Sequence, residues 1–298
     1  MQTIIKIFLY YILLFFSVLT YAANSSQLNK NNESEPSHIG NFALPYSQQP
    51  GPLIGLGENI LNKNETQLFI FGDDYVGVGQ HFIDAIPGIL YGITDYLSIF
   101  VNTPIAVSYQ QNNNHSAGFE DMFIQLEDAF YNKSTQSYTD QATILGNVTL
   151  PTGSSTKQPP TGVGSPSFLL GATFDRTYVD WFLFASPGAI LTTTHDNTKF
   201  GNEYLYQGGF GRNITNINDW MFAWMIEGDG QYSQKNRVSG VTQINSGGNV
   251  VYITPSLWIS SKKLIFQLGV GYPVIQHLNG NQNRNLYLIA ANVGWTLS

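Results

Sequence analysis

Residues 263–275 read KLIFQLGVGYPVI, and this stretch decides the fold class. Apolar side chains fall on every second residue from Leu264 to Val274, while Gln267 and two glycines stand on the other face. Successive side chains of a β-strand point to opposite faces, so the period-two pattern predicts a strand with one apolar face. No other element type places its side chains with this period.

Twelve segments of similar character follow one another from Thr66 to the C-terminus, although the register of the first is the least clear. They cover residues 66–76, 82–93, 96–109, 119–131, 141–150, 165–175, 178–191, 203–212, 220–232, 249–259, 263–275 and 285–297. Short connections alternate with longer polar ones along most of the chain. Membrane barrels have this asymmetry, with short periplasmic turns and longer outer loops.

The composition supports a barrel over a soluble domain or a helical membrane protein. Charged residues make up 11% of the 298 residues and aromatic residues 14%, whereas a soluble domain has about 25% charged residues. Beyond the N-terminus, no apolar run reaches the roughly 20 residues that a membrane helix needs. We therefore expect an all-β protein, a membrane-spanning antiparallel up-and-down β-barrel of about twelve strands.

The sequence before the barrel divides into two parts. Residues 1–22 resemble a cleaved signal peptide, with Lys6, an apolar core and small residues at the cleavage site; the alternative is a retained N-terminal anchor. Residues 23–64 are rich in Asn, Ser and Gln at first, which predicts a flexible periplasmic arm. The arm could also be a plug or a docking segment, and residues 52–61 are apolar enough to enter the barrel. The barrel itself is expected over residues 65–298.

The more polar face of each strand should line the lumen, and its charged members are all acidic. The pore-lining candidates are Asp84, Asp121, Gln125, Glu127, Asp180, Glu203, Glu227 and Asp229. Rings of Asp and Glu favour cations over anions, so one interpretation is a lumen of negative potential. The other is that these carboxylates bond to neighbouring groups and fill the interior.

Catalytic and cofactor motifs are weak. The five histidines are not at metal-ligand spacing and the chain has no Cys, so we expect no metal site and no cofactor. A Ser–His–Asn site of the outer-membrane phospholipase kind would need a positioned histidine, and His81, His195 and His277 lie near the expected outer rim. The sequence singles out no such trio, so we expect no enzyme. The net charge of −7 argues against nucleic acid as a partner.

Three short motifs carry a family resemblance. They are YGITD at 91–95, GFED at 118–121, and LPTG at 150–153 followed by TGVG at 161–164. Together they resemble a family of outer-membrane transporters linked to the meta-pathway of phenol degradation, over roughly residue 68 to the C-terminus. Glu120 departs from the glycine expected there, and Glu127 and Asp128 are acidic where that family often carries a basic residue. The resemblance implies passage of aromatic or other small hydrophobic compounds.

We therefore expect a porin-like channel for small solutes, with a mildly acidic lumen, in the outer membrane of a Gram-negative bacterium. Its expected partners are outer-membrane lipid, small-molecule solutes and the outer-membrane assembly machinery. The alternating C-terminal strand, which ends in Ser298, resembles the signal which that machinery recognises. The alternative function is a non-conducting surface barrel that binds a ligand, a host factor or a protein through its outer loops.

Overall fold

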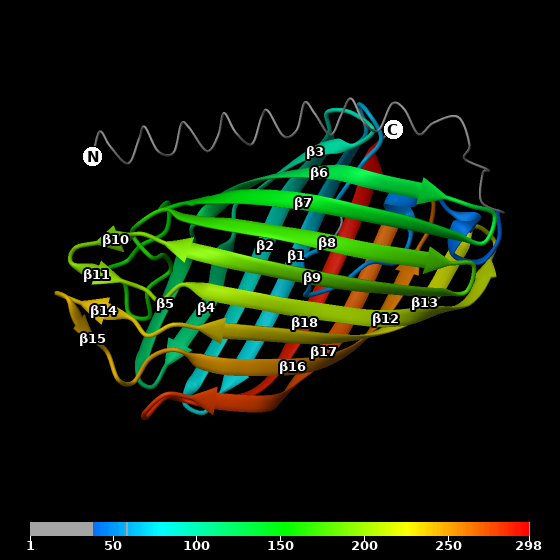
Figure 1. Ribbon diagram of the computed structural model, residues 1–298. Coiled ribbons are helices and arrows are strands. Elements are labelled where there is room, and N and C mark those ends of the chain that lie inside the picture. The colour runs from blue at the N-terminus through cyan, green and yellow to red at the C-terminus, as the bar shows by residue number, and fades with distance from the viewer. Residues whose placement is uncertain (1–37, 58, 298) are drawn as a thin grey trace.

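The sheet closes on itself, as the sequence predicts. The computed structural model describes residues 38–57 and 59–297, so the expected signal peptide lies outside the described residues. β1 (Thr66–Gly77) pairs antiparallel with β2 (Gln80–Gly92) on one side and with β18 (Asn285–Leu297) on the other (Figure 1). Closure leaves no sheet edge, which is what allows strands to cross hydrocarbon with every backbone group paired. Among the described residues, no helix is long and apolar enough to span a membrane.

The closed sheet has twelve strands, and two of them are interrupted. One is divided into β3 (Leu97–Asn102) and β4 (Ile105–Gln111), and the next into β5 (Asn114–Phe119) and β6 (Met122–Ser134). The remaining strands are β7 (Tyr138–Leu150), β8 (Ser167–Tyr178), β9 (Trp181–Thr192), β12 (Glu203–Ile217), β13 (Trp220–Ser233), β16 (Gly248–Ser260) and β17 (Leu264–Leu278).

The two interruptions lie side by side on neighbouring strands. Pro104 follows β3, and a proline cannot donate to a strand ladder. The backbone N–H of Glu120, which follows β5, donates instead to the Pro104 carbonyl at 2.9 Å. The ladder is therefore bent at this point without leaving these two groups unpaired.

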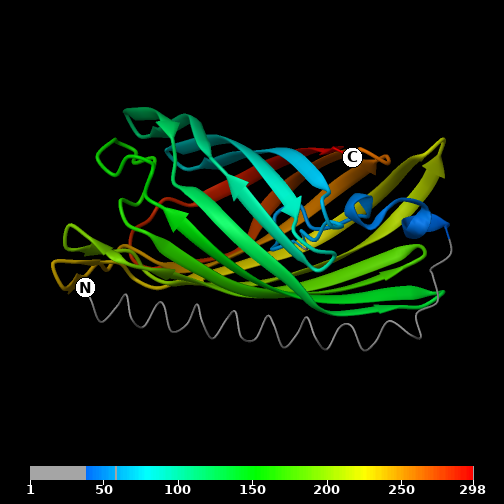
Figure 2. The same ribbon diagram turned by 90° about the horizontal axis from the view of Figure 1, so that it is seen from above.

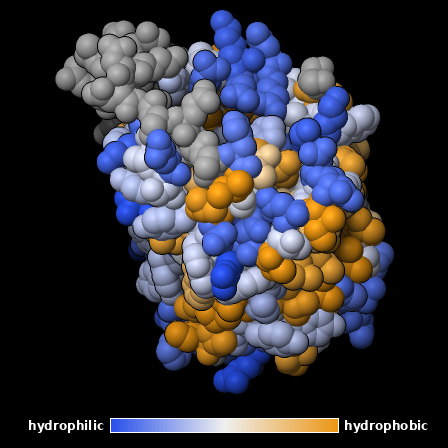
Figure 3. All heavy atoms as spheres, turned by 90° about the vertical axis from the view of Figure 1, so that its right-hand side faces the viewer, coloured by the Kyte–Doolittle hydropathy of each residue, from blue (hydrophilic) through white to orange (hydrophobic). Residues whose placement is uncertain are grey.

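Side chains alternate between the outer and inner faces as predicted. On β17, Leu268 is 55% exposed, whereas its neighbour Gln267 is 5% exposed. Hydrophobic side chains gather on the sides of the molecule, next to hydrophilic ones at the end facing the viewer in Figure 3. The outer surface is thus suited to lipid and the inner one to polar contacts.

The two ends of the barrel differ. At one end, the turn end, the connections are short; the turn at Asn218 and Asp219 has both residues at positive φ, which suits a tight hairpin. At the other, the loop end, the longer connections form a small sheet of four strands. These are β10 (Thr194–His195), β11 (Thr198–Lys199), β14 (Arg237–Val238) and β15 (Val241–Thr242). The small sheet lies at the left in Figure 1.

The described part of the expected flexible arm is packed against the barrel. We call residues 38–57 and 59–64 the inner segment; it contains the 3-10 turns η2 (Gly40–Ala43) and η3 (Tyr46–Gln48). It enters at the turn end, where it is drawn in blue in Figure 2. Asn41 fixes the entry, because its backbone N–H donates to the Val179 carbonyl at 2.7 Å and its side chain donates to Tyr178 O at 2.9 Å.

Candidate functional site

The candidate site is the lumen, where polar side chains of the wall hold the inner segment. Four of the predicted pore-lining residues are buried within the barrel. Glu227 is fully buried, Glu127 is 1% exposed, Asp229 is 6% exposed and Gln125 is 7% exposed. The inner segment accounts for the deep burial of the two glutamates, because both bind it directly.

Glu227 on β13 makes the densest of these contacts. Its carboxylate accepts from three consecutive backbone N–H groups: Leu53 at 2.8 Å, and Ile54 and Gly55 at 3.1 Å each. Consecutive N–H groups that converge on one anion form a binding nest, and hydrogen bonds to a charged acceptor are stronger than neutral ones. Glu227 therefore anchors the innermost turn of the segment.

Glu127 on β6 anchors the returning part of the segment. Its carboxylate accepts from the backbone N–H and the side-chain Nδ2 of Asn59, both at 2.7 Å. Gln125 donates to the same carboxylate and accepts from Asn147, so the anchor belongs to a wider polar network. The bond from Gln125 orients the Glu127 carboxylate independently of the inner segment.

Hydrogen bonds tie the inner segment to strands all around the barrel. Besides Glu127 and Glu227, the wall groups that bond to residues 48–57 and 59–61 are Ser98 on β3, Ser186 on β9, Gln207 on β12, Ser260 on β16, Gln267 on β17 and Thr296 on β18. This part of the segment bonds to side chains on eight different strands, so it crosses the lumen. It does not follow one side of the wall.

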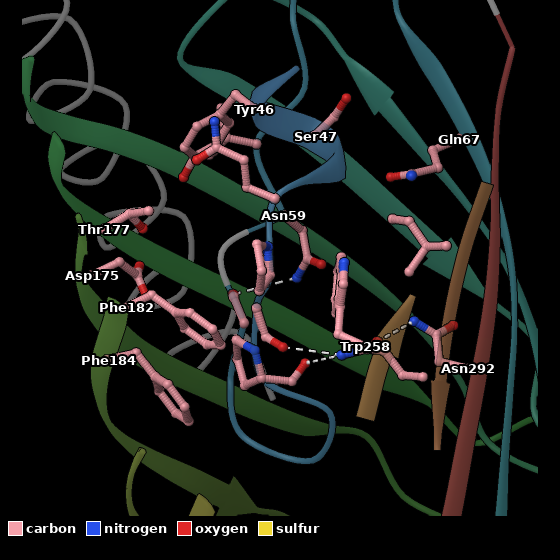
Figure 4. A pocket seen from close by; sticks show the side chains of 18 of the residues that line it. Tyr46, Ser47, Asn59, Gln67, Asp175, Thr177, Phe182, Phe184, Trp258 and Asn292 are labelled. Carbon is pink, nitrogen blue, oxygen red and sulfur yellow. Dashed lines mark hydrogen bonds between the residues drawn. The ribbon is translucent and has the colours of Figure 1, made fainter. Parts of the chain in front are cut away.

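An apolar cluster supports the innermost turn. Leu53 packs with inward-facing rings and aliphatic side chains of β9, β13, β16 and β17, among them Phe182, Phe184, Met225 and Trp258. In Figure 4, Phe182 and Trp258 lie on opposite sides of the inner segment. Burial of Leu53 adds about 2 kcal/mol of hydrophobic stabilisation to the hydrogen bonds.

The other predicted residues lie in four different places. Asp84 on β2 is the cross-strand partner of Asp73, an acidic residue that the sequence analysis missed because the register of the first strand was unclear. Glu203 lines a cavity at the loop end. Asp180 is exposed in the turn between β8 and β9, away from the wall of the lumen.

Asp121 lies between β5 and β6, where it holds an outer loop. Its two carboxylate oxygens accept from Gly153 N at 2.8 Å and from Val163 N at 2.7 Å. The GFED motif thus binds the LPTG and TGVG motifs. A Cβ on Gly162 would lie 2.4 Å from the Asp121 carboxylate, so the contact requires glycine there.

Cavities remain beside the described residues of the inner segment. One of about 570 Å³ lies at the loop end and has Ile54 of the inner segment among its lining. Another of about 580 Å³ lies at the turn end, against Phe42 and Leu44. A third, of about 110 Å³, lies between the segment and the aromatic wall, and Figure 4 shows its lining.

The lining of these cavities combines carboxylates with polar and apolar side chains. Of the described residues that line them, none is Lys or Arg, whereas Asp95, Asp175, Glu203 and Asp229 are among them. The interior around these cavities therefore has carboxylates on its walls and no described Lys or Arg among the lining residues. Much of its charge is engaged, because Glu127 and Glu227 already bind the inner segment.

Comparisons with known proteins agree with the fold. No family model and no curated protein matches the chain. A COG4313 outer membrane channel from Pseudomonas putida F1 is similar in structure, with a TM-score of 0.68 at 12% identity over 82% of this chain and 100% of the other. The NanC porin (TM-score 0.47, 12% identity, 78% and 99% covered) and LpxR from Salmonella typhimurium (0.45, 9%, 77% and 99%) are more distant.

Of these three structures, the COG4313 channel is similar enough to support an argument. Because its sequence identity is 12%, that argument is about the fold alone. It agrees with the closed all-β barrel described above. This chain has the fold of an outer-membrane β-barrel.

Proposed function

We propose that this protein is an outer-membrane channel for small solutes whose lumen is closed, in the observed state, by its own inner segment. The observation that carries the proposal is that the segment crosses the barrel interior, where its residues 48–57 and 59–61 are held by hydrogen bonds to side chains on eight strands. Cavities lie on both sides of it, at the loop end and at the turn end. Movement of the segment would join them.

Aromatic or small hydrophobic solutes are the proposed cargo. The resemblance of the YGITD, GFED and LPTG motifs implies this class. The cavity of about 110 Å³ adds support, because Phe69, Phe182, Phe184 and Trp258 line it. Apolar cavities of roughly 150 Å³ hold benzene, so one small ring is of the right order. Export with cleavage of residues 1–22, and insertion by the outer-membrane assembly machinery, belong to the same proposal.

A non-conducting surface barrel is the second candidate. One observation favours it: the inner segment is anchored by two buried carboxylates, which makes a permanently closed lumen physically reasonable. In that case the loop end would bind a ligand or a protein, and the barrel would serve as its support.

Conductance in planar bilayers separates the two candidates. We expect low conductance for the full chain and higher, cation-preferring conductance for a variant lacking residues 41–60. A deleted variant that is folded, as judged by heat-modifiable migration in a gel, but that does not conduct would reject the channel and favour the surface barrel.

A cross-linked variant serves as the matched control. Ser186 Oγ donates to the Leu56 carbonyl at 2.7 Å, which places Leu56 beside β9. In the variant with Leu56→Cys and Ser186→Cys, a short reagent that joins two thiols through reducible bonds would tether the segment to β9. The natural chain has no Cys, which makes this pair the sole source of thiols. After cross-linking we expect the lowest conductance of the series, and reduction should restore the wild-type value.

A further inference from the structure

The loop-end cavity has the features of a binding site for an organic cation. It is bounded by Ile54 of the inner segment, by the inner faces of β1, β12, β13 and β16, and by loop residues such as Asn236 and Gln282. Its volume of about 570 Å³ exceeds what a single ion needs and suits an organic molecule. A solute that enters from the loop end would meet this cavity before it meets the inner segment.

Asp229 is a carboxylate with unused bonding capacity in this cavity. It is 6% exposed and lines the cavity, yet its Oδ1 has no hydrogen-bond partner among the described residues. Its Oδ2 accepts one long bond, from Thr254 Oγ1 at 3.4 Å. Buried polar atoms are nearly always paired, so an unpaired carboxylate oxygen beside a cavity points to a missing donor.

Two tyrosine rings stand next to this carboxylate. Tyr252 is the cross-strand partner of Asp229 and its ring packs edge-to-face on Tyr75, with centroids 6.4 Å apart and planes at 83°. Both rings line the same cavity. Perpendicular rings beside a carboxylate form the corner of an aromatic cage, which attracts ammonium groups through the ring faces.

Gly271 on β17 leaves space beside the carboxylate. A Cβ on Gly271 would lie 3.0 Å from Thr254 Oγ1, which is tight, and 3.5 Å from Tyr252 Cδ1, which is an ordinary van der Waals distance. A larger residue would therefore press on the Thr254 hydroxyl that donates to Asp229.

The charges around the cage exclude anions. Glu203 also lines the cavity, and none of the described residues that line it is Lys or Arg. Asp73 lies two residues before Tyr75 on the same face of β1, and Asp84 is its cross-strand partner. A cation would therefore be attracted by several carboxylates, whereas a carboxylate ligand would be repelled.

We propose that the loop-end cavity binds organic monocations, with Asp229 as the counter-ion and the Tyr75 and Tyr252 rings as the cage around a primary or quaternary ammonium group. The proposal deepens the proposed function by naming the charge of the solute. A role of this cavity in uptake rests on the proposed channel function. Binding itself requires no movement of the inner segment.

Calorimetric titration of the detergent-solubilised full chain tests this with three single-ring probes of similar size. They are benzylammonium, neutral benzyl alcohol and the anion benzoate. We expect benzylammonium to bind at least about tenfold more tightly than benzyl alcohol, because ion pairing and cation–π contact act on the cation alone. Equal affinity for the cation and the alcohol would overturn the proposal without any variant.

Matched variants locate the site. Asp229→Asn should weaken benzylammonium binding about tenfold or more, since it removes the counter-ion. Asp196→Asn removes the same charge from the same end, where that side chain is 89% exposed, and should leave binding unchanged. If both variants have the same effect, the attraction is a general surface charge, and the cage at Asp229 is rejected.

The rings are tested separately. Tyr252→Phe keeps the ring face and should bind benzylammonium as the natural chain does, whereas Tyr252→Leu should bind it several-fold more weakly. Equal binding by the two variants would remove the cage from the proposal. Failure of the proposed channel function is distinguishable from failure of this binding site. The full chain can bind benzylammonium even if the variant lacking residues 41–60 does not conduct.

Discussion

Glu227 is the residue on which the position of the inner segment depends most directly, because one carboxylate accepts three backbone N–H groups. Replacing Glu227 with Gln exchanges one acceptor oxygen for an NH2 group, which cannot accept from the three backbone N–H groups. Each hydrogen bond to a charged group contributes about 1.5–3 kcal/mol, so we expect amide exchange at Leu53, Ile54 and Gly55 to accelerate at least about tenfold.

Hydrogen exchange read by mass spectrometry measures this effect. The control is Asp219→Asn. It removes an exposed carboxylate from the turn between β12 and β13, away from the inner segment. Unchanged protection of residues 53–55 in the Glu227 variant would show that packing of Leu53, and not the carboxylate, holds the segment.

Gly92 gives the YGITD motif a physical reason. A Cβ there would lie 2.1 Å from the Asn62 carbonyl oxygen, where the inner segment leaves the lumen. Asp95 of the same motif accepts from the Lys63 backbone N–H at 3.0 Å. The motif therefore fixes the path from the inner segment into the first strand.

We expect Gly92→Ala to lower stability by about 1–3 kcal/mol, the usual cost of forcing an extra carbon into a packed site. The measurement is the temperature at which the folded, faster-migrating band disappears from a gel. Gly51→Ala is the matched control, because a Cβ on Gly51 meets nothing within 4 Å. Equal melting of the two variants would contradict this account.

At the scale of the strand, alternation was sufficient to locate all twelve strands. The predicted segment 285–297 coincides with β18, and 203–212 is the first part of β12. The apolar face read from 263–275 is the lipid-facing side of β17. Period-two patterning is a local property set by the two environments of a membrane barrel, so it can be read without knowledge of tertiary contacts.

Other elements could not be read in this way. The four short strands of the small sheet have two residues each, too few to show a period. The place of the inner segment depends on hydrogen bonds between residues far apart in the chain, such as Asn59 and Glu127, which are 68 positions apart, and no local pattern reports them. Glu127 and Glu227 stand on the more polar faces of their strands in the sequence, but the sequence does not indicate the partners they bind.

The lipid-facing side of β17 supports a prediction at the same scale. Leu268→Lys should destabilise the barrel by about 2 kcal/mol or more, because it exposes an ammonium group to hydrocarbon. Val241→Lys makes the same kind of change at a residue that is 65% exposed in the small sheet, and should have little effect. Guanidinium titration of protein folded into lipid vesicles would compare them, and equal losses would place β17 away from lipid.

At the scale of the whole molecule, the barrel and its small sheet are separate in their bonding. The strands β10, β11, β14 and β15 pair with one another and not with the closed sheet. We expect trypsin to cut the folded protein after Arg237, which is exposed on β14, and to leave a nicked barrel that still migrates as folded. Loss of the folded band upon cleavage would show that the small sheet is needed to hold the barrel together.

The inner segment precedes every strand in the chain, but its binding groups are spread from β3 to β18. Thr296, which receives Gln48, lies two residues from the end of the chain. The docking place therefore does not exist until the last strand has been laid beside the first. The inner segment can therefore dock completely only after the barrel has closed, so a docked inner segment would report that the wall around it is finished.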